Sequence, residues 1–457
     1  MDTTPAPFIP PAPGPRQSPP SLLEMFRIVY NNPIELWGEP SYNEPYVYIR
    51  AGIGGPLLIA NDPALIRHIL VEKSKSFRMA RVRQLILKPI LNEGLLTSEN
   101  EIWKRSRKAM SPVFTPRNIH GFAQSMVRST DAFATRYETL EGPFDMAQHM
   151  TELTFEILAE TLFTGQVAGE PDEFGEQIER LFETAARIDP LDIIAAPKWI
   201  PRITRVRGRK TLRYFRNLVK ETVAMRAGMM ERGEDVPDDF MTLLLRTEGE
   251  NGLTRDEIED NVITFFGAGH ETTARALAWT VYLLAKTPEE RVRVEDEVKR
   301  VSKEKENPLE WIDAMPCTRA AFEEAMRLYP PAPTISREAI EDITWDGQTI
   351  TKGTQAFIMP WTLHRHRKYW DNPDAFIPSR FLPENREKID RFQYLPFGAG
   401  PRVCIGATFA LQEAIIALAV LMSRYRFDMA PGAEEPWPVQ KLTTQPGGGL
   451  QMVATAI

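Results

Sequence analysis

The chain contains two cysteines, Cys317 and Cys404, which are far apart in the sequence. Cys404 lies in a glycine-rich segment, residues 397–406, that reads FGAGPRVCIG. Two thiols cannot build a multi-cysteine metal cage, but one thiolate can be the axial ligand of a haem iron, where it favours O–O cleavage. Glycines let backbone N–H groups approach the sulfur and tune its potential. The segment therefore indicates a thiolate-bound metal cofactor.

A second segment with chemical potential, GAGHETT at residues 267–273, lies inside a long apolar helix predicted from about residue 254 to 284. Glycine costs about 1 kcal/mol relative to alanine in a helix, so the segment predicts a kink or local unwinding. Helical spacing places Phe265, Ala268 and Thr272 near one face, with Glu271 beside them as a proton source. That face would leave room for a flat cofactor. A helix that uses glycine for tight packing is the alternative.

Two further helices carry donors and charges at helical spacing. Glu324 and Arg327 stand at i and i+3 in a largely apolar helix. A buried ion pair needs additional hydrogen bonds, which Arg380 could supply, whereas an exposed pair would contribute little. Trp103 and Arg107 stand at i and i+4 and offer only donors, which suits an anionic partner such as a carboxylate.

The composition argues against several classes of protein. The formal charge is 55 − 62 = −7, which disfavours non-specific binding of nucleic acid. Two distant cysteines predict no disulfide framework and a reducing compartment. We find no apolar run of about 18 residues and no signal-peptide pattern, so we expect a cytoplasmic protein without a transmembrane anchor.

Most of the chain has the period of α-helices, and strand patterns occur near both ends. The strands are predicted at residues 46–50, 56–60 and 355–359, with a hairpin at 343–350. Eight of the first twenty residues are proline, which predicts a flexible, extended arm. We therefore expect a flexible arm over residues 1–20 and a single domain over 21–457 that is mainly α with a smaller β region.

At this point the motifs, in this order, resemble the cytochromes P-450, the thiolate-haem monooxygenases, in their soluble bacterial type. The resemblance extends from about Pro33 to the C-terminus. It gives Cys404 the role of iron ligand, within the loop from Phe397 to Gly406. It also implies that Arg337 and Arg402 are partners of the haem propionates.

The other motifs are also similar to motifs of this family. The residues Trp103 and Arg107 are similar to the pair that holds a haem propionate, and residues 268–272 to the oxygen-activating element of the central helix. The pair Glu324 and Arg327, with Arg380 of the PSRF segment, is similar to the group that locks the core around the haem.

The resemblance implies a single triangular fold with haem b between the long helix and the helix that follows the cysteine loop. It implies insertion of one oxygen atom from O₂ into a C–H bond or double bond of a lipophilic small molecule. Thr272 would hydrogen-bond the bound O₂ and Glu271 would relay protons. The electrons would come ultimately from NAD(P)H.

The electron donor is expected to be a separate ferredoxin or flavodoxin with its reductase, because the chain leaves no room for a fused one. Lys104, Arg105 and Lys108, with Arg402, would form a basic patch on the cysteine side that attracts it. We expect a monomer. A peroxide-driven hydroxylase and a haem sensor or carrier without turnover are the alternatives.

The substrate side is less well defined by the sequence. Phe265, Phe266 and Ala268 predict an apolar pocket wall for a fatty acid, terpenoid, steroid or aromatic compound. The apolar segment 188–201 contains three prolines and predicts either a lid, a membrane contact or an ordinary packed loop.

Overall fold

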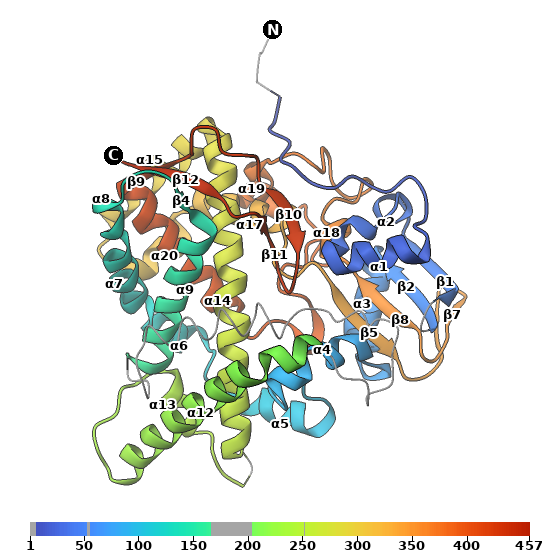
Figure 1. Ribbon diagram of the computed structural model, residues 1–457, viewed down its shortest axis with the longest axis horizontal. Helices are drawn as coiled ribbons and strands as arrows, with labels where there is room; N and C mark the ends of the chain where they lie inside the picture. The colour runs from blue at the N-terminus through green and yellow to red at the C-terminus, as the bar shows by residue number, and fades with distance from the viewer. Residues whose placement is uncertain (1–5, 53–54, 166–202, 251) are drawn as a thin grey trace.

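The central element of the computed structural model, which describes residues 6–52, 55–165, 203–250 and 252–457, is the long helix α14 (Arg255–Lys286). Its start is set by a capping box: Glu257 N–H donates to the Thr254 hydroxyl, and Thr254 N–H donates to the Glu257 carboxylate. The helix is continuous, so the unwinding predicted at residues 267–273 does not occur. Figure 1 shows α14 between a sheet on one side and a helical layer on the other.

Several of the remaining helices pack against α14, and others lie beside the main sheet (Figure 1). Their bounds are α1 (Leu22–Asn31), α2 (Pro40–Asn43), α3 (Pro63–Arg67), α4 (Arg81–Leu91), α5 (Asn100–Met110), α6 (Pro116–Gly121), α7 (Ala123–Ala134), α8 (Arg136–Thr139), α9 (Met146–Phe163), α12 (Ile203–Glu231), α13 (Phe240–Leu245), α15 (Pro288–Glu304), α16 (Trp311–Ala314), α17 (Pro316–Leu328), α18 (Pro360–Leu363), α19 (Pro383–Arg386) and α20 (Ala407–Arg424).

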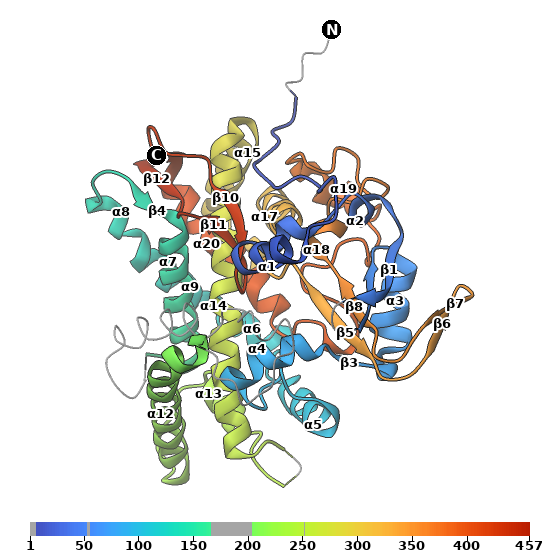
Figure 2. The ribbon, with the colours of Figure 1, turned by 45° about the vertical axis from the view of Figure 1, so that its right-hand side comes forward.

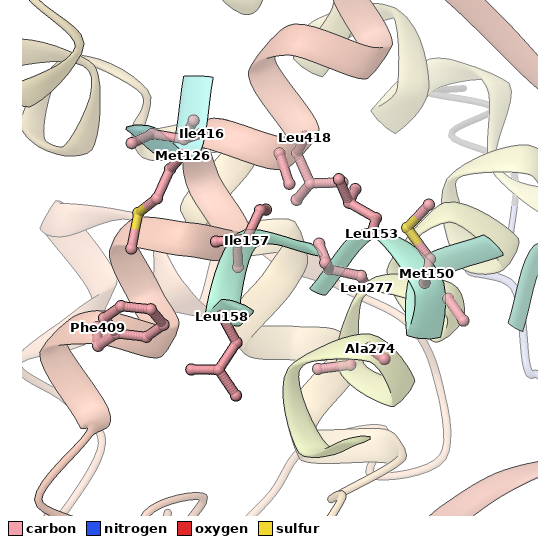
Figure 3. Packing of buried hydrophobic residues seen from close by; sticks show 14 of the residues in the cluster. Met126, Met150, Leu153, Ile157, Leu158, Ala274, Leu277, Phe409, Ile416 and Leu418 are labelled. Atoms are coloured by element: carbon pink, nitrogen blue, oxygen red, sulfur yellow. The ribbon is translucent and has the colours of Figure 1, made fainter. Parts of the chain in front are cut away.

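The main hydrophobic core lies where α7, α9, α14 and α20 pack together (Figure 3). Leu153 and Ile157 of α9 meet Leu277 of α14 there, and all three are fully buried. A Cβ atom on Gly269 would lie 3.2 Å from Leu158 Cδ2. Glycine therefore admits α9 close to α14, as the tight-packing alternative for residues 267–273 requires.

The β structure is smaller and joins distant parts of the chain. Its main sheet has the order β1-β2-β8-β5-β3, with β2 and β8 parallel and the other pairs antiparallel. A second sheet has the order β4-β12-β9, and β6–β7 and β10–β11 are hairpins. The bounds are β1 (Tyr46–Gly52), β2 (Gly55–Ala60), β3 (Phe77–Met79), β4 (Phe144–Asp145), β5 (Ile335–Ala339), β6 (Ile343–Trp345), β7 (Gln348–Ile350), β8 (Gln355–Ile358), β9 (Tyr425–Met429), β10 (Trp437–Gln440), β11 (Thr444–Gly447) and β12 (Gln451–Ala456). The prediction of a mainly α fold with a smaller β region is confirmed.

Part of the proline-rich N-terminal segment lies against the body of the protein. Phe376 N–H donates to Phe8 O (2.9 Å), and the Tyr329 hydroxyl donates to Pro11 O (2.8 Å). The Phe8 ring also lies edge-on to Tyr282, with 6.4 Å between ring centroids. These contacts attach residues 8–11 to the core, and the division of the chain at residue 20 stays a prediction.

One helix in the described part of the chain, α20, is long and apolar enough to cross a membrane by length and composition alone. However, 67% of this segment is buried inside the fold. Its residues from Ala414 to Met422 lie in the main core. The position of α20 is therefore that of a core helix.

Candidate functional site

The loop before Cys404 has a shape that only glycine permits at two positions. Gly398 and Gly400 have φ angles of 69° and 75°, in the left-handed region. A Cβ atom on Gly400 would lie 1.9 Å from Leu70 O, so any other residue would force the chains apart. The loop closes where Cys404 N–H donates to Phe397 O (2.9 Å). It presents the Cys404 side chain as an exposed thiol.

The surroundings of Cys404 act on its pKa in two directions. Crowding by protein atoms raises the pKa of the thiol, although one side of it is accessible, while a hydrogen bond from the Gly406 backbone and the charge of Arg107 lower it. Arg107 belongs to α5 and also donates to Val403 O (3.1 Å). A bound cation would complete the stabilisation of the thiolate, because a metal ion lowers the pKa of a thiol ligand.

Cationic side chains gather beside this loop. The Arg402 guanidinium lies 4.6 Å from the centre of the Trp103 ring, and it donates to Ser98 O (2.8 Å). Arg337 projects from β5, where burial and then the charges of Arg83 and Arg402 lower its pKa to about 9. Burial and the charge of Arg402 lower the pKa of Arg83 to about 10. The sequence-predicted residues Trp103, Arg107, Arg337 and Arg402 thus converge, and Arg83 of α4 joins them.

The charges of these arginines indicate whether an anionic cofactor fits at this site. The charge of Arg83 acts on Arg337, and that of Arg402 acts on both, whereas the Glu99 carboxylate opposes Arg337 and Arg402. Glu99 also accepts a hydrogen bond from Met79 N–H (2.7 Å). Guanidinium groups bind carboxylates well, so two propionates of a haem would balance the excess charge. The residues present fit the group.

The middle of α14 has one face that protein side chains leave uncovered. Ala268 is exposed and Thr272 is half-buried, whereas residues 262–266 are all buried. The Thr272 hydroxyl donates to Ala268 O (2.7 Å). In the described ranges, nothing else on this core helix between Ile258 and Leu284 is exposed, so the face around Ala268 is the candidate position for a flat cofactor.

An aromatic residue that the sequence did not single out connects this face with the cysteine loop. The rings of Phe114 and Phe265 are 5.0 Å apart, and a Cβ atom on Gly406 would lie 4.0 Å from Phe114 Cε1. Phe266 points elsewhere: it is fully buried and stacks on Phe163 of α9, with 5.2 Å between centroids. Of the two phenylalanines in the predicted wall, Phe265 therefore lies nearer the loop.

The acid beside Thr272 is held by a distant part of the chain. The Thr443 hydroxyl donates to Glu271 Oε1 (2.6 Å), and both residues are buried. Within the described residues, Glu271 Oε2 is buried and has no hydrogen-bond partner. His270 has a structural role, because its Nδ1 lies 2.6 Å from Phe266 O inside the helix.

A second buried acid, Glu413 of α20, faces the same stretch of α14. Its side chain is 1% exposed, and burial raises its pKa to about 8, against a smaller lowering by a hydrogen bond to Thr273. The sequence does not mark this residue, because a single glutamate in an apolar helix has no distinctive spacing. Its proximity to Thr273 follows only from the packing of α20 on α14.

The residues Glu324, Arg327 and Arg380 form one buried network. Arg327 donates to Glu324 through Nε (2.7 Å) and Nη2 (2.8 Å), and neither side chain is exposed. Arg380 Nε and Ile377 N–H add hydrogen bonds to Glu324 Oε1 at 3.4 and 2.9 Å. The remaining guanidinium protons go to backbone carbonyls of residues 364, 373 and 375.

Two other features lie outside this site. Cys317 is half-buried, and burial with the nearby Glu297 carboxylate raises its pKa to about 11, which makes it a poor ligand. A cavity of about 320 Å³ is lined by Arg209, Arg213, Arg216 and their neighbours on α12. In the part of the chain that the structure describes, no three His, Cys, Asp or Glu side chains could hold a metal ion.

The comparison with known families decides what this arrangement is. A family model described as Cytochrome P450 matches residues 44–452. The chain belongs to the cytochrome P450 family. It is a P450 monooxygenase, which implies haem, the use of O₂, a hydrophobic substrate and a redox partner. The predicted P450 fold is confirmed.

The relatives of this P450 come from several kingdoms. Cyclooctatin synthase of Streptomyces melanosporofaciens is 31% identical over 397 residues, which cover 86% of this chain and 85% of that protein. Protein LUTEIN DEFICIENT 5 of Arabidopsis thaliana is 28% identical over 407 residues, with 85% and 67% covered. Human cytochrome P450 4V2 is 27% identical over 435 residues, with 90% and 83% covered. This range leaves the soluble bacterial type a prediction.

Proposed function

We propose that this P450 inserts one oxygen atom from O₂ into a C–H bond or double bond of a lipophilic small molecule. Relatives named cyclooctatin synthase and cytokinin hydroxylase, the latter 30% identical over 405 residues, support an oxidative role on small molecules. The observation that carries the proposal is the combination of an accessible Cys404 with an uncovered face at Ala268 and Thr272. Two electrons would reach the site from NAD(P)H through a separate partner.

The chain's own residues would hold the cofactor in a defined way. Cys404 would ligate the iron, and Ala268 would leave room for the ring on the other face. The set Trp103, Arg107, Arg337 and Arg402, extended by Arg83, would bind the propionates. Phe397 and Gly406 would close the loop around the sulfur. When bound, haem supplies the chemistry that activates O₂.

The polar atoms of α14 would handle the protons. The Thr272 hydroxyl gives its proton to Ala268 O, so its lone pairs are available to accept a hydrogen bond on the uncovered side. Glu271 Oε2 is available to take up and release a proton, since Thr443 occupies the other oxygen. Phe265 and Ala268 would form the apolar wall, with Phe266 supporting it from the core.

The spectrum of the reduced protein with carbon monoxide tests the site. We expect a thiolate-type spectrum that is lost in Cys404→Ser and kept in the matched variant Cys317→Ser. A thiolate-type spectrum in Cys404→Ser would contradict the ligand assignment. The purified protein is then supplied with NAD(P)H, a surrogate ferredoxin and reductase, and dodecanoic acid, geraniol, progesterone or naphthalene. A normal spectrum without coupled product from this panel would favour the haem carrier.

The redox partner is proposed to be a ferredoxin or flavodoxin that docks beside α5. The predicted basic patch is partly neutralised, because Lys104 pairs with Glu101 (2.6 Å) and Arg105 pairs with Glu257 of α14. Lys108 is exposed and has no acidic partner in the described part of the chain. Lys108 is therefore the member of the patch most available to an acidic partner.

This docking proposal has a charge-reversal test. Lys108→Glu is expected to slow reduction by the surrogate ferredoxin about threefold at low salt, with a weaker salt dependence. The control Lys352→Glu makes the same charge change on the turn after β7, and it is expected to leave reduction unchanged. Equal rates in the two variants would contradict docking at this face.

A monomeric, cytoplasmic enzyme with one haem domain over residues 21–457 remains our proposal for the whole chain. The segment 188–201, for which the sequence predicts a lid, a membrane contact or a packed loop, lies outside the described residues. Equilibrium sedimentation tests the monomer, and cell fractionation tests the location. A membrane fraction that holds most of the protein would contradict the cytoplasmic assignment.

A further inference from the structure

The contact between Thr443 and Glu271 joins two segments that are 172 residues apart. Thr443 lies in the turn of the β10–β11 hairpin, which Figure 2 shows beside α14. Its hydroxyl has one proton, and the carboxylate can only accept when ionised, so the hydroxyl is the donor. With 2.6 Å between the oxygens and both side chains buried, this is a short hydrogen bond that is shielded from water.

The donor is held rigidly by its neighbours. Thr444 N–H donates to Pro331 O (3.1 Å), the Thr444 hydroxyl donates to Pro330 O (2.7 Å), and Trp279 Nε1–H donates to Thr444 O (3.2 Å). These bonds attach the hairpin to the segment after α17 and to α14 itself. The turn is thus fixed on both sides of the acid that it contacts.

The other strand of the hairpin is fixed as well. Asn32, at the end of α1, donates to Pro438 O (3.0 Å) and accepts from Gln440 N–H (2.9 Å). Lys441 N–H donates to Thr443 O (3.0 Å) and closes the turn. The Thr443 hydroxyl therefore approaches Glu271 from a scaffold that is bound to three separate parts of the fold.

The hydrogen bond from Thr443 affects the two oxygens of the Glu271 carboxylate differently. A free glutamate samples several rotamers, and one bond from a rigid donor removes most of that freedom. Oε1 is occupied, whereas Oε2 has no partner among the residues that the structure describes. The contact therefore orients one oxygen by binding the other.

We propose that Thr443 is a positioning residue for Glu271: it binds Oε1 and so keeps Oε2 in the orientation needed for proton exchange beside Thr272. This inference rests on the proposed role of Glu271 and adds a partner to it. In this role Thr443 acts through Glu271. Its removal should leave substrate binding intact and reduce the fraction of electrons that reach product.

The test compares four variants of the haem-loaded protein: Thr443→Val, Thr443→Ser, Glu271→Gln and the control Thr280→Val. Valine has nearly the volume of threonine without the donor, and serine keeps the donor. Thr280 lies on α14, the helix that carries Glu271, and its buried hydroxyl donates to Ala276 O (2.7 Å). Thr280→Val therefore makes the same threonine-to-valine change without removing a contact to Glu271.

The first readout is product formed per NAD(P)H consumed with the panel compound that gives most product. We expect Thr443→Val to lower this ratio about threefold to tenfold, with the lost electrons recovered as peroxide, and Thr443→Ser to restore it. The dissociation constant of the compound, from its spectral shift, should not change. Thr280→Val should keep the wild-type ratio.

The outcomes separate this proposal from the one on which it rests. If Glu271→Gln keeps the wild-type ratio, the proton role of Glu271 is wrong. If Glu271→Gln lowers the ratio and Thr443→Val does not, only the positioning role is wrong. If serine fails to restore the ratio, the hydroxyl is not what matters and the proposal is also overturned.

A second readout does not depend on turnover. The unfolding midpoints of Thr443→Val, Glu271→Gln and the double variant form a double-mutant cycle, and a direct contact predicts non-additive shifts. Additive shifts would overturn the proposal. If Thr443→Val does not fold, Thr443→Ala replaces it in the same cycle, because alanine removes the donor without placing an extra methyl group there.

Discussion

Two buried carboxylates, Glu324 and Glu271, differ in how many hydrogen bonds they accept from their surroundings. Four hydrogen bonds from Arg327, Arg380 and Ile377 N–H reach the oxygens of Glu324. Glu271 receives one, from Thr443, and its second oxygen has no partner in the described ranges. Buried charge is costly unless it is fully bonded, so the two sites cannot serve the same purpose.

The difference separates a structural region from one suited to chemistry. The bonds from Ile377 N–H and Arg380 to Glu324, and those from Arg327 to the carbonyls of residues 373 and 375, attach α17 to the segment 372–380, which precedes the cysteine loop. A carboxylate whose two oxygens both accept hydrogen bonds from a charged donor cannot exchange protons readily. Glu271, and Glu413 on the neighbouring helix α20, keep an oxygen without a partner among the described residues. Incomplete bonding near Thr272 is therefore what a proton path requires.

The largest effect is expected from breaking the satisfied network. Arg327→Ala leaves Glu324 as a buried charge that only Arg380 opposes, and we expect a loss of about 3–5 kcal/mol in the free energy of unfolding. Haem retention should fall with it. Urea unfolding followed by circular dichroism measures the loss. Arg386→Ala removes a half-exposed partner of Glu323 and serves as the control, with less than about 1 kcal/mol.

Urea unfolding of a lysine variant tests whether charge or hydrogen-bond geometry stabilises the network. Arg327→Lys keeps the charge but cannot make the paired bonds to Glu324 or reach three carbonyls at once. It should therefore destabilise the protein nearly as much as alanine does. Full stability in the lysine variant would show that charge, and not the geometry of the network, holds this region.

The second effect concerns pH and the α14–α20 contact. Burial raises the pKa of Glu413 from its ordinary 4.5 to about 8, so the folded state favours the protonated acid. Stability from this group is present below pH 4.5 and is lost as the pH rises through about 8. Glu413→Gln should therefore flatten that decline and gain on the order of 2 kcal/mol above the folded pKa.

Urea midpoints measured from acid to alkaline pH check this prediction. Glu289 is an exposed carboxylate on α15, and Glu289→Gln should keep the wild-type slope. A wild-type slope in Glu413→Gln as well would mean that Glu413 ionises freely in the folded protein. In that case Glu413 would no longer support the proposed difference between the two regions, which would rest on Glu271 alone.

Sequence reasoning predicted the parts of this comparison that rest on local spacing. The i,i+3 spacing of Glu324 and Arg327 and the glycines before Cys404 are local properties, and the structure brings these residues together as expected. The family resemblance supplied Arg337 and Arg402. The local unwinding predicted in α14 does not occur, because close packing of Leu158 on Gly269 and hydroxyl contacts within the helix accommodate the glycines.

The residues that were missed depend on packing between distant segments. Thr443 meets Glu271 only because the β10–β11 hairpin is attached to α14 and α1. Arg83 and Phe114 approach the cysteine loop from a short helix and a turn whose sequences have no distinctive spacing. Phe266 was included in the predicted pocket wall, but the sequence cannot tell on which side of α14 the helix α9 lies.

The smallest effect is expected at the edge of the satisfied network. Arg380 Nε is 3.4 Å from Glu324, its side chain is 13% exposed, and burial lowers its pKa more than Glu324 raises it. Arg327 already makes two shorter bonds to the same carboxylate, so Arg380→Ala should cost about 1 kcal/mol in unfolding free energy. The same urea titration measures it. A loss as large as that in Arg327→Ala would mean that Glu324 depends equally on both arginines, and that its satisfaction is shared across the network and not supplied by one paired contact.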